Sequence, residues 1–490
     1  MTDAARATGE VSDVPDLPTG PLIALLTGSA FVVILNETIM SVALPDLMRE
    51  FRVPATTAQW LTTAFLLTMA IVIPISGWLL TRLPLRTVFV VAMGSFTAGT
   101  LICATAPVFG ALVAGRVVQA VGTALMMPLL ITTILNVVAP DRRGRMMGIV
   151  SIVISVAPAI GPTISGVVLD QLTWRWMFWL VLPIAMIALV AGAAWVRNVT
   201  DPRNSPLDVA SVIFSALAFG GLIYGLSTVG EASAGSAPPP VQPWIPLVIG
   251  AAAFVVFVRR QLALQSRALL DLRAFATRTF SAAVLLVAVS MMALFGTLIL
   301  LPIYLQSALG LSTLVTGLML LPGGLTMGLL APIVGRLFDR YGPGPLVAPG
   351  ALIACIALWD MTRFDLGTGK GTVIAAYVLL SVGLAFMFTP LLTSALGSLP
   401  HHLYSHGSAI VGTVQQVAGA AGTALFVTVM TRTSADSLSD GRSSLASVAE
   451  GVHAALLWGG IISAAAVALA LFVPRPKSLL VNDVPAEVTA

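Results

Sequence analysis

The sequence predicts an all-α membrane protein with about fourteen spans, and three observations support this fold class. Of the 490 residues, 57% are hydrophobic and only 9% are charged, and the mean hydropathy is +0.98, whereas soluble domains carry about 25% charged residues. Apolar runs of about 20 residues, the length at which a helix crosses a bilayer, follow one another along the chain. These runs are about twice as long as the strands of a membrane barrel and do not alternate in polarity.

The candidate spans leave little room for a soluble domain. The two longest connections between them are 261–278 and 432–452. The other connections are too short to fold alone. The candidate spans cover residues 21–44, 58–80, 86–106, 108–137, 145–169, 176–196, 208–229, 243–260, 279–305, 312–337, 345–362, 371–396, 406–431 and 453–473.

The distribution of Lys and Arg predicts that both termini are cytoplasmic. With the N-terminus inside, the inner segments hold 17 of the 25 basic residues and the outer segments hold 7, while Arg116 lies within a span. Cytoplasmic loops of membrane proteins carry such an excess of basic residues. Residues 1–20 contain four acidic residues and a single basic one, Arg6. They do not resemble a secretory signal peptide, so we expect a cytoplasmic tail.

Several classes of partner and cofactor are not expected. The net charge of +4 comes from basic residues scattered over short loops, which argues against nucleic acid. Cys103 and Cys355 each stand alone in an apolar run, and His402 and His406 have no cysteine or carboxylate beside them. Neither a disulfide nor a metal site is therefore predicted. The chain has no P-loop to support ATP-driven transport and no nucleophile–base pair to support an enzyme.

The basic segment 259–280 leaves two interpretations open. It is partly amphipathic, so one interpretation places it on the inner membrane face, where each basic side chain near anionic lipid contributes about 1 kcal/mol. The other is a plain linker whose arginines follow from the orientation of the chain.

Two similar loops suggest an internal repeat. GWLLTRLPLR, at 77–86, follows the second span, and GRLFDRYGPG, at 335–344, follows the tenth. Both place a glycine at the end of a span, followed by a basic turn. Transporters are often built from such repeats, with the substrate site between the halves.

These motifs resemble those of the major facilitator superfamily and, within it, of the fourteen-helix drug:proton antiporters. The loop at 335–344 is similar to the superfamily's Gly-x-Leu-x-Asp-Arg-x-Gly motif. Four further stretches resemble motifs of the first, fourth and fifth helices and of the segment before the ninth span. The Leu-Asn-Glu-Thr spelling in the first of them resembles lincosamide-type exporters. In chain order they are LNETIMSVALP (35–45), GRVVQAVGTALMMP (115–128), SVAPAIGPTISGVV (155–168) and ALLDLRAFATRTF (268–280).

The resemblance implies a domain organisation and a function. It implies a major facilitator fold, with two six-helix bundles and two extra transmembrane helices inserted between them. The expected parts are a tail at 1–20, a bundle at 21–196, the extra helices with a basic linker at 197–278, a bundle at 279–473 and a tail at 474–490. It also implies proton-driven export of lipophilic drugs across the inner cell membrane by alternating access, without a cofactor. The alternatives are a dedicated exporter of a native metabolite, lipid or siderophore, and an intramembrane enzyme or scaffold.

Two departures from the family pattern bear on mechanism. In the first-half loop, Thr81 and Pro84 stand where the family has aspartate and glycine. Threonine cannot make the charge contact that helps to latch the closed inner gate, whereas Asp339 in the second half can. In the first helix, Asn36 stands where many relatives have aspartate, and Glu37 follows it. Because one residue turns a helix by about 100°, this carboxylate can face a different direction from the usual one.

Glu37 and Arg116 are the clearest ionisable residues deep in the candidate spans. A charge at the bilayer centre costs roughly 2.5–3.5 kcal/mol on insertion scales, so such residues usually face a bundle interior or a water-filled cavity. A carboxyl removed from water holds its proton to a higher pH than an exposed one, which makes Glu37 a candidate proton carrier. The alternative is a structural residue that hydrogen-bonds with its neighbours. Arg116 takes part either in gating and proton coupling or in structure alone.

Further residues are candidates for substrate contact and for gating, with ordinary packing as the alternative for most of them. Methionine suits adaptable surfaces, and buried amides need partners. The predicted substrate contacts are Asn36, Gln119, Met127, Met291, Phe295, Gln415 and Gln416. In the fifth span, small residues and prolines recur every four residues, which allows close helix approach and bending. The predicted gating residues are Pro158, Gly161, Pro162, Gly166, Gly335, Asp339 and Arg340.

Overall fold

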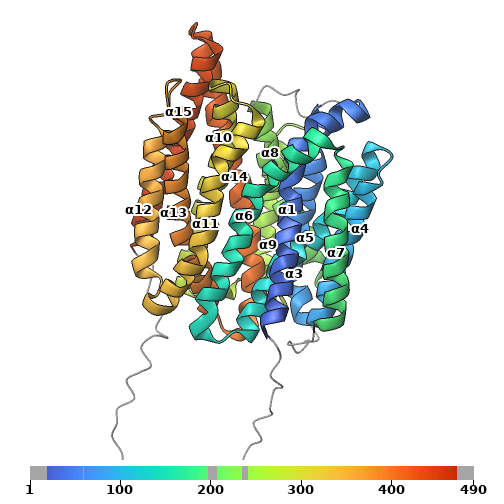
Figure 1. Ribbon diagram of the computed structural model, residues 1–490. Helices are drawn as coiled ribbons and strands as arrows, with labels where there is room; N and C mark the ends of the chain where they lie inside the picture. Colours follow the sequence, from blue (N-terminus) through green and yellow to red (C-terminus); the bar gives the residue numbers. More distant parts are fainter. Residues whose placement is uncertain (1–18, 54, 59, 197–206, 234–240, 472–490) are drawn as a thin grey trace, which may run out of the picture.

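The protein consists of long helices packed side by side. The computed structural model describes residues 19–53, 55–58, 60–196, 207–233 and 241–471, and every regular element in this part of the chain is helical. Fourteen helices in it are long and apolar enough to cross a membrane, which confirms the predicted fold class. Figure 1 shows these helices side by side, with both ends of the described chain at the bottom. We call this end of the molecule the terminal face and the other end the opposite face.

The first six spanning helices form one group, which we call the first bundle. Within it α1 contacts α5, α6 and α7, and α5 also contacts α3 and α4. Gly192 shows how closely they pack, because a Cβ there would lie 1.9 Å from the Phe89 ring of the facing helix. The helices are α1 (Thr19–Phe51), α3 (Trp60–Arg82), α4 (Leu85–Ala104), α5 (Phe109–Val137), α6 (Arg143–Gln171) and α7 (Arg175–Trp195), with the short α2 (Ala55–Ala58) between α1 and α3.

The last six spanning helices form the second bundle. In this group α13 contacts α10, α11 and α12, while α15 contacts α10, α12 and α14. The two bundles meet where α6 lies along α11 and where α3 and α5 lie against α14. The helices are α10 (Arg278–Ile303), α11 (Thr313–Tyr341), α12 (Gly344–Met361), α13 (Lys370–Gly397), α14 (Tyr404–Ser439) and α15 (Ser444–Ala470), and a π-helical turn (Tyr304–Ala308) follows α10.

Two further helices, α8 (Val209–Ser233) and α9 (Trp244–Leu264), pack against each other as a hairpin. They lie in the background of Figure 1, behind α6 and α1. α8 contacts α3 of the first bundle and α14 of the second, and the rings of Trp60 on α3 and Tyr224 on α8 stack with centroids 6.1 Å apart. The hairpin therefore lies across the junction of the two bundles on one side.

A polar network holds the terminal end of this hairpin. Both oxygens of Asp208 accept hydrogen bonds from Arg260, at 2.7 and 2.8 Å. These bonds hold the pKa of Asp208 well below its ordinary value. The buried Gln261 beside it donates to Ser211 of α8 at 2.7 Å and accepts from the backbone of Leu269 at 2.7 Å. The network ties α8, α9 and the following linker together.

The linker after α9 is packed against the protein. It contains two 3-10 turns, Gln265–Arg267 and Leu272–Ala276. The side chains of Leu269 and Leu270 are buried, and the Leu269 carbonyl lies 3.2 Å from Nδ1 of His406 at the start of α14. The linker therefore joins the hairpin to the second bundle covalently and also packs against that bundle.

Some helices run beyond the predicted spans. α1 continues to Phe51, and α14 and α15 cover most of the expected connection 432–452. The two extensions hold each other: Ser437 and Arg442 both donate to Glu450, at 2.7 and 2.5 Å, and a Cβ at Gly451 would lie 2.3 Å from the Met430 carbonyl. Hydropathy does not reveal these turns, because they are polar and owe their stability to mutual packing.

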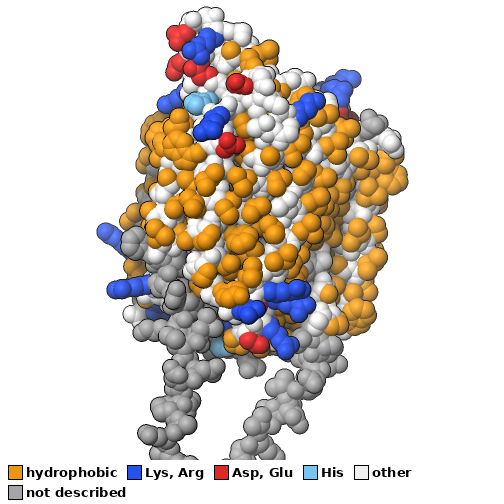
Figure 2. Space-filling view, turned by 60° about the vertical axis from the view of Figure 1, so that its left-hand side comes forward, with side chains coloured by type: hydrophobic (Ala, Val, Ile, Leu, Met, Phe, Trp, Pro, Cys, Tyr) orange, Lys and Arg blue, Asp and Glu red, His pale blue; other side chains and the backbone are white. Residues whose placement is uncertain are grey.

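The surface has the polarity of a membrane protein. Figure 2 shows a broad hydrophobic band on the face in view, with most of the charged side chains gathered above and below it. Large apolar side chains are exposed along spanning helices of both bundles and the hairpin, including Ile187, Val255 and Leu329. Together with the fourteen long apolar helices, this surface identifies a multi-pass membrane protein.

Candidate functional site

A cavity lies between the two bundles, and helices of both form its wall. It contains about 1150 Å³ of empty space, including the part that opens to solvent. The first bundle contributes Ile34, Glu37, Thr38, Met69, Ile73, Thr123, Ala124, Met127, Pro128 and Pro158; the second contributes Met291, Leu294, Phe295, Leu298, Gly324, Met327, Tyr377, Ser381, Gly412, Gln415 and Gln416.

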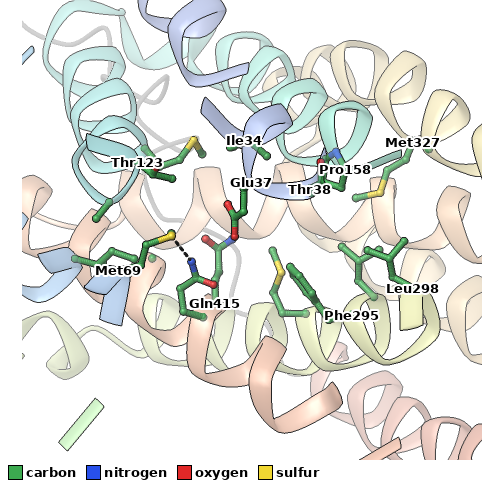
Figure 3. Close-up of a pocket in the computed structure, with 18 of the residues that line it drawn as sticks. Ile34, Glu37, Thr38, Met69, Thr123, Pro158, Phe295, Leu298, Met327 and Gln415 are labelled. Carbon is green, nitrogen blue, oxygen red and sulfur yellow. Dashed lines mark hydrogen bonds between the residues drawn. The ribbon is translucent and has the colours of Figure 1, made fainter. Parts of the chain in front are cut away.

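Glu37 is the one charged side chain among these wall residues. It projects from the middle of α1 into the cavity, towards Gln415 on α14 (Figure 3). The rest of the wall is apolar or neutral and polar, with four methionines spread over α3, α5, α10 and α11. The structure thus presents a carboxylate where a bound molecule can contact it.

Arg116 lies deeper in the first bundle, with only 1% of its surface exposed. Its Nη1 donates to Oδ1 of Asn36 at 3.3 Å and to Oε1 of Gln119 at 2.9 Å, and the guanidinium lies 4.0 Å from the centre of the Phe65 ring. The amide of Gln119 in turn donates to Thr100 at 2.8 Å. Among the described residues no carboxylate lies within ion-pair distance of Arg116, although the charge of Glu37 acts on it.

The predicted substrate contacts divide into two groups. Five of them line the cavity: Met127, Met291, Phe295, Gln415 and Gln416. Asn36 and Gln119 are instead buried beside Arg116, and neither belongs to the cavity wall.

Other wall residues were missed by the sequence reasoning. Met69 and Ile73 on α3, Met327 on α11, and Tyr377 with Ser381 on α13 line the cavity. Their apolar or weakly polar character is shared with lipid-facing and core positions, so only helix packing identifies them.

Asp339 joins the two bundles near the terminal face. Its two carboxylate oxygens accept from the backbone N–H groups of Gly144 and Arg145, at 2.8 and 2.9 Å. These groups begin α6, so a side chain of α11 caps a helix of the other bundle. Gly335 permits this approach, because a Cβ there would lie 2.3 Å from the Gly144 carbonyl oxygen. The side chain of Arg340 is exposed, with its guanidinium 5.2 Å from the centre of the Tyr341 ring.

Further contacts close the same side. The hydroxyls of Thr132 and Ser408 lie 3.0 Å apart, and Thr389 donates to Ser151 at 2.8 Å. Arg143 donates to the Tyr404 hydroxyl at 3.0 Å. By contrast, Thr81 donates to the Trp78 carbonyl of its own helix at 2.8 Å. The loop motif at 335–344 thus makes a contact between bundles, and the bond formed by the threonine of the first half stays within α3.

The predicted gating residues of α6 have different surroundings. Pro158 lines the cavity, and a Cβ at Gly161 would lie 2.2 Å from the Thr38 hydroxyl of α1. At Gly166 no atom lies within 4 Å of the position that a Cβ would occupy. The side chain of Pro162 lies outside the described residues. The close approach at Gly161 is therefore between two helices of the same bundle.

His406, near the start of α14, packs against the linker, with Nδ1 3.2 Å from the Leu269 carbonyl oxygen, whereas His401 and His402 are exposed. Within the described part of the chain, no group of three His, Cys, Asp or Glu side chains has the arrangement of a metal site.

Comparison with known proteins identifies relatives among drug-resistance proteins. The chain is 41% identical over 462 residues to "Lincomycin resistance protein LmrB" of Listeria monocytogenes, covering 93% of this chain and 97% of the relative. It is 40% identical over 410 residues to the protein of the same name from Bacillus subtilis, with 84% and 85% covered. A "Multidrug resistance protein B homolog" of Mycobacterium tuberculosis is 31% identical over 449 residues, with 88% and 80% covered.

Solved structures share the fold at low sequence identity. The human organic anion transporter MFSD10 superposes with a TM-score of 0.67 at 15% identity, covering 92% of this chain and 99% of the other. The proton:xylose symporter XylE superposes with a TM-score of 0.63 at 16% identity, covering 93% and 96%. The family model of the Major Facilitator Superfamily matches residues 26–423. The chain therefore belongs to the Major Facilitator Superfamily, as its motifs indicate.

Proposed function

We propose that this protein exports lincomycin and other lipophilic, amphipathic drugs, and that an inward flow of protons drives the export. The family and the fold are those of transporters, and the most similar relatives reported above are named for drug resistance. The observation that carries the proposal is the single carboxylate of Glu37 in a cavity whose other wall residues are uncharged.

The wall suits substrates with an apolar body and a few polar groups. Methionines adapt their shape to different apolar surfaces, and four of them line the cavity together with Phe295. Hydroxyls and amides, including those of Ser381 and Gln416, offer hydrogen bonds without fixing a charge. Such a wall favours a range of related compounds over a single rigid ligand.

The orientation of the chain decides which side of the cavity is closed. The terminal face carries most of the loop arginines, so we assign it to the cytoplasm. The contacts of Asp339 and the other pairs between bundles then belong to a closed inner gate. When this gate opens, substrate enters from the cytoplasm or the inner leaflet. When it closes, the cavity turns to the outside.

Coupling arises because Glu37 serves both flows. Protonated from the outside, its carboxyl is neutral when the cavity turns inward. Inside, the proton leaves and the drug binds to the deprotonated form. Drug and proton exclude each other in one cavity, so a new proton from the outside later displaces the drug. Arg116, held by Asn36 and Gln119, supplies a fixed positive charge nearby that favours release of the proton.

The test uses inside-out vesicles from cells that produce the protein. Lincomycin should accumulate in these vesicles when respiration acidifies the lumen, and collapse of the pH difference with nigericin should abolish the uptake. Accumulation that survives nigericin would argue against proton coupling. A gradient-driven proton flux with no drug uptake across a compound panel would favour an exporter of a native metabolite.

A further inference from the structure

Two neighbouring amides of α14 have different surroundings. Gln416 donates from Nε2 to the sulfur of Met69 on α3, at 3.7 Å. The Nε2 of Gln415 is shielded from solvent and has no hydrogen-bond partner in the described part of the chain. A buried N–H group without a partner costs free energy. The group is therefore expected to find its partner in another state of the transport cycle.

The cavity offers a suitable partner. Glu37 on α1 and Gln415 on α14 both belong to its wall, and Figure 3 shows the two side chains extending towards each other. One belongs to the first bundle and the other to the second. A hydrogen bond between them would link the bundles in the middle of the protein, whereas the contacts of Asp339 link them near the terminal face.

We propose that Gln415 is a positioning residue whose Nε2–H donates to the carboxylate of Glu37 once Glu37 has lost its proton. An ionised carboxylate accepts a stronger hydrogen bond than a neutral carboxyl group does. The bond therefore forms in the deprotonated state and weakens when a proton returns. The proposal rests on the proposed role of Glu37 as proton carrier and adds the group of the second bundle that senses its charge.

Two other groups act near Glu37. Arg116 acts electrostatically from α5, and Tyr377 on α13 brings a phenol to the same wall. The remaining wall residues, on α1, α3, α5, α6, α10, α11, α13 and α14, carry no titratable side chain. Removal of the Gln415 amide should therefore change the ionisation of Glu37. The variants below leave Arg116 and Tyr377 unchanged.

The test follows the ionisation of Glu37 directly. Dicyclohexylcarbodiimide modifies protonated carboxyl groups in apolar surroundings, so the extent of Glu37 modification, measured by mass spectrometry across a pH series, gives its titration midpoint. Gln415→Met keeps the length of the side chain and removes the donor. Because a hydrogen bond to a charged group is lost, the midpoint should move up by about one pH unit. Gln416→Met, one residue away, is the matched control and should leave the midpoint unchanged.

Equal midpoints in the wild-type protein and Gln415→Met would overturn the proposal, and so would the same shift in both variants, which would indicate a general change in cavity polarity. If Gln415→Met does not yield folded protein, Gln415→Leu replaces it. The measurement needs neither drug nor gradient, so an unmoved but titrating Glu37 leaves the proposed function standing. A Glu37 that stays unreactive at every pH contradicts both.

Discussion

At the scale of single residues, the neighbours Asn36 and Glu37 divide two tasks. The amide of Asn36 faces the bundle interior and accepts from Arg116, while the carboxylate of Glu37 faces the cavity. One position along a helix turns a side chain by about 100°, which accounts for the division. A buried guanidinium is tolerated here because amide oxygens and the Phe65 ring surround it. The carboxylate is thereby left free for a proton or a substrate.

Asp339 provides the first prediction at this scale. Asp339→Asn keeps one acceptor oxygen but removes the charge and the second oxygen, so one of two N–H groups at the start of α6 loses its bond. With a loss of about 1–2 kcal/mol in the closed inner gate, efflux should fall roughly five- to thirty-fold. Drug efflux at matched expression measures this.

Thr81→Ala is the control for Asp339→Asn. The hydroxyl of Thr81 donates to a carbonyl of its own helix. Because the loss of such a local hydrogen bond is roughly neutral, its removal should change efflux by less than about two-fold. Comparable losses in the two variants would mean that the two halves of the protein latch symmetrically after all.

At the level of single residues, the sequence singles out the charged groups but does not give the orientation of the neutral ones. Glu37 and Arg116 stand out in the sequence because charges are rare in spans. The placement of Asn36 and Gln119 beside Arg116 could not be predicted, because it depends on which face of α1 and α5 meets the other. Met69 and Tyr377 were missed since lipid, core and cavity all accept such side chains in a membrane.

At the scale of helices, α6 and α11 form the longest junction between the bundles. A Cβ at Gly148 would lie 2.5 Å from the Ala331 carbonyl, and a Cβ at Gly328 would lie 2.1 Å from Val156. Together with the contact at Gly335, these positions bring the two backbones close along much of their length. Small residues at such a junction allow helices to slide or separate without side-chain interlocking.

The second prediction tests this junction. Gly335→Val would force branched atoms into the Gly144 backbone, which cannot move aside as a flexible side chain can. Overpacking costs about 1–3 kcal/mol, so efflux should fall about five-fold or more while the protein still inserts. Gly166→Ala is the matched control, because its Cβ would meet no atom within 4 Å. If Gly166→Ala also lost efflux, the junction of α6 with α11 would not be the part of α6 that controls gating.

The hairpin of α8 and α9 provides the third prediction. Hydrogen bonds from Arg260 hold the pKa of Asp208 below its ordinary value in the folded protein. A lowered pKa in the folded state contributes stability above the unfolded pKa, near 4, and this contribution is lost as the pH falls further. Asp208→Asn should therefore melt about 1–3 °C below wild type at pH 7, with the difference shrinking below pH 4. Melting of the purified protein across pH measures it.

Arg259→Gln is the control for Asp208→Asn, since it removes a neighbouring exposed charge and leaves the pair with Arg260 in place. Its melting temperature should match wild type at every pH. A difference for Asp208→Asn that is independent of pH would show that the ionised carboxylate is not what anchors the hairpin.

At the scale of the whole molecule, the sequence predicted more than it did for single residues. Spans, their number and the family follow from apolar runs and ordered motifs, because a bilayer demands about 20 apolar residues from each helix. Helix ends did not follow, since the extensions of α14 and α15 are polar and depend on mutual contact. The division into domains at 196 and 278, and the cytoplasmic location of both termini, stay predictions.

The fourth prediction concerns orientation. In a background with both native cysteines replaced, Ala276→Cys lies on the terminal face and Ser439→Cys lies on the opposite face, and both positions are exposed. An impermeant maleimide added to intact cells should label the cysteine at 439 and spare the one at 276, because the basic face stays in the cytoplasm. The reverse pattern would invert the assigned direction of transport.

The central claim is that Glu37 carries the proton that drives export, and substrate-induced proton release from the purified protein tests it most directly. Lincomycin added to the weakly buffered wild-type protein should release protons. Glu37→Gln keeps the shape of the side chain but cannot ionise, so it should bind lincomycin without proton release and should fail to move it uphill in liposomes with a pH gradient. Wild-type proton release and gradient-driven transport in Glu37→Gln would contradict the account and place the proton site elsewhere.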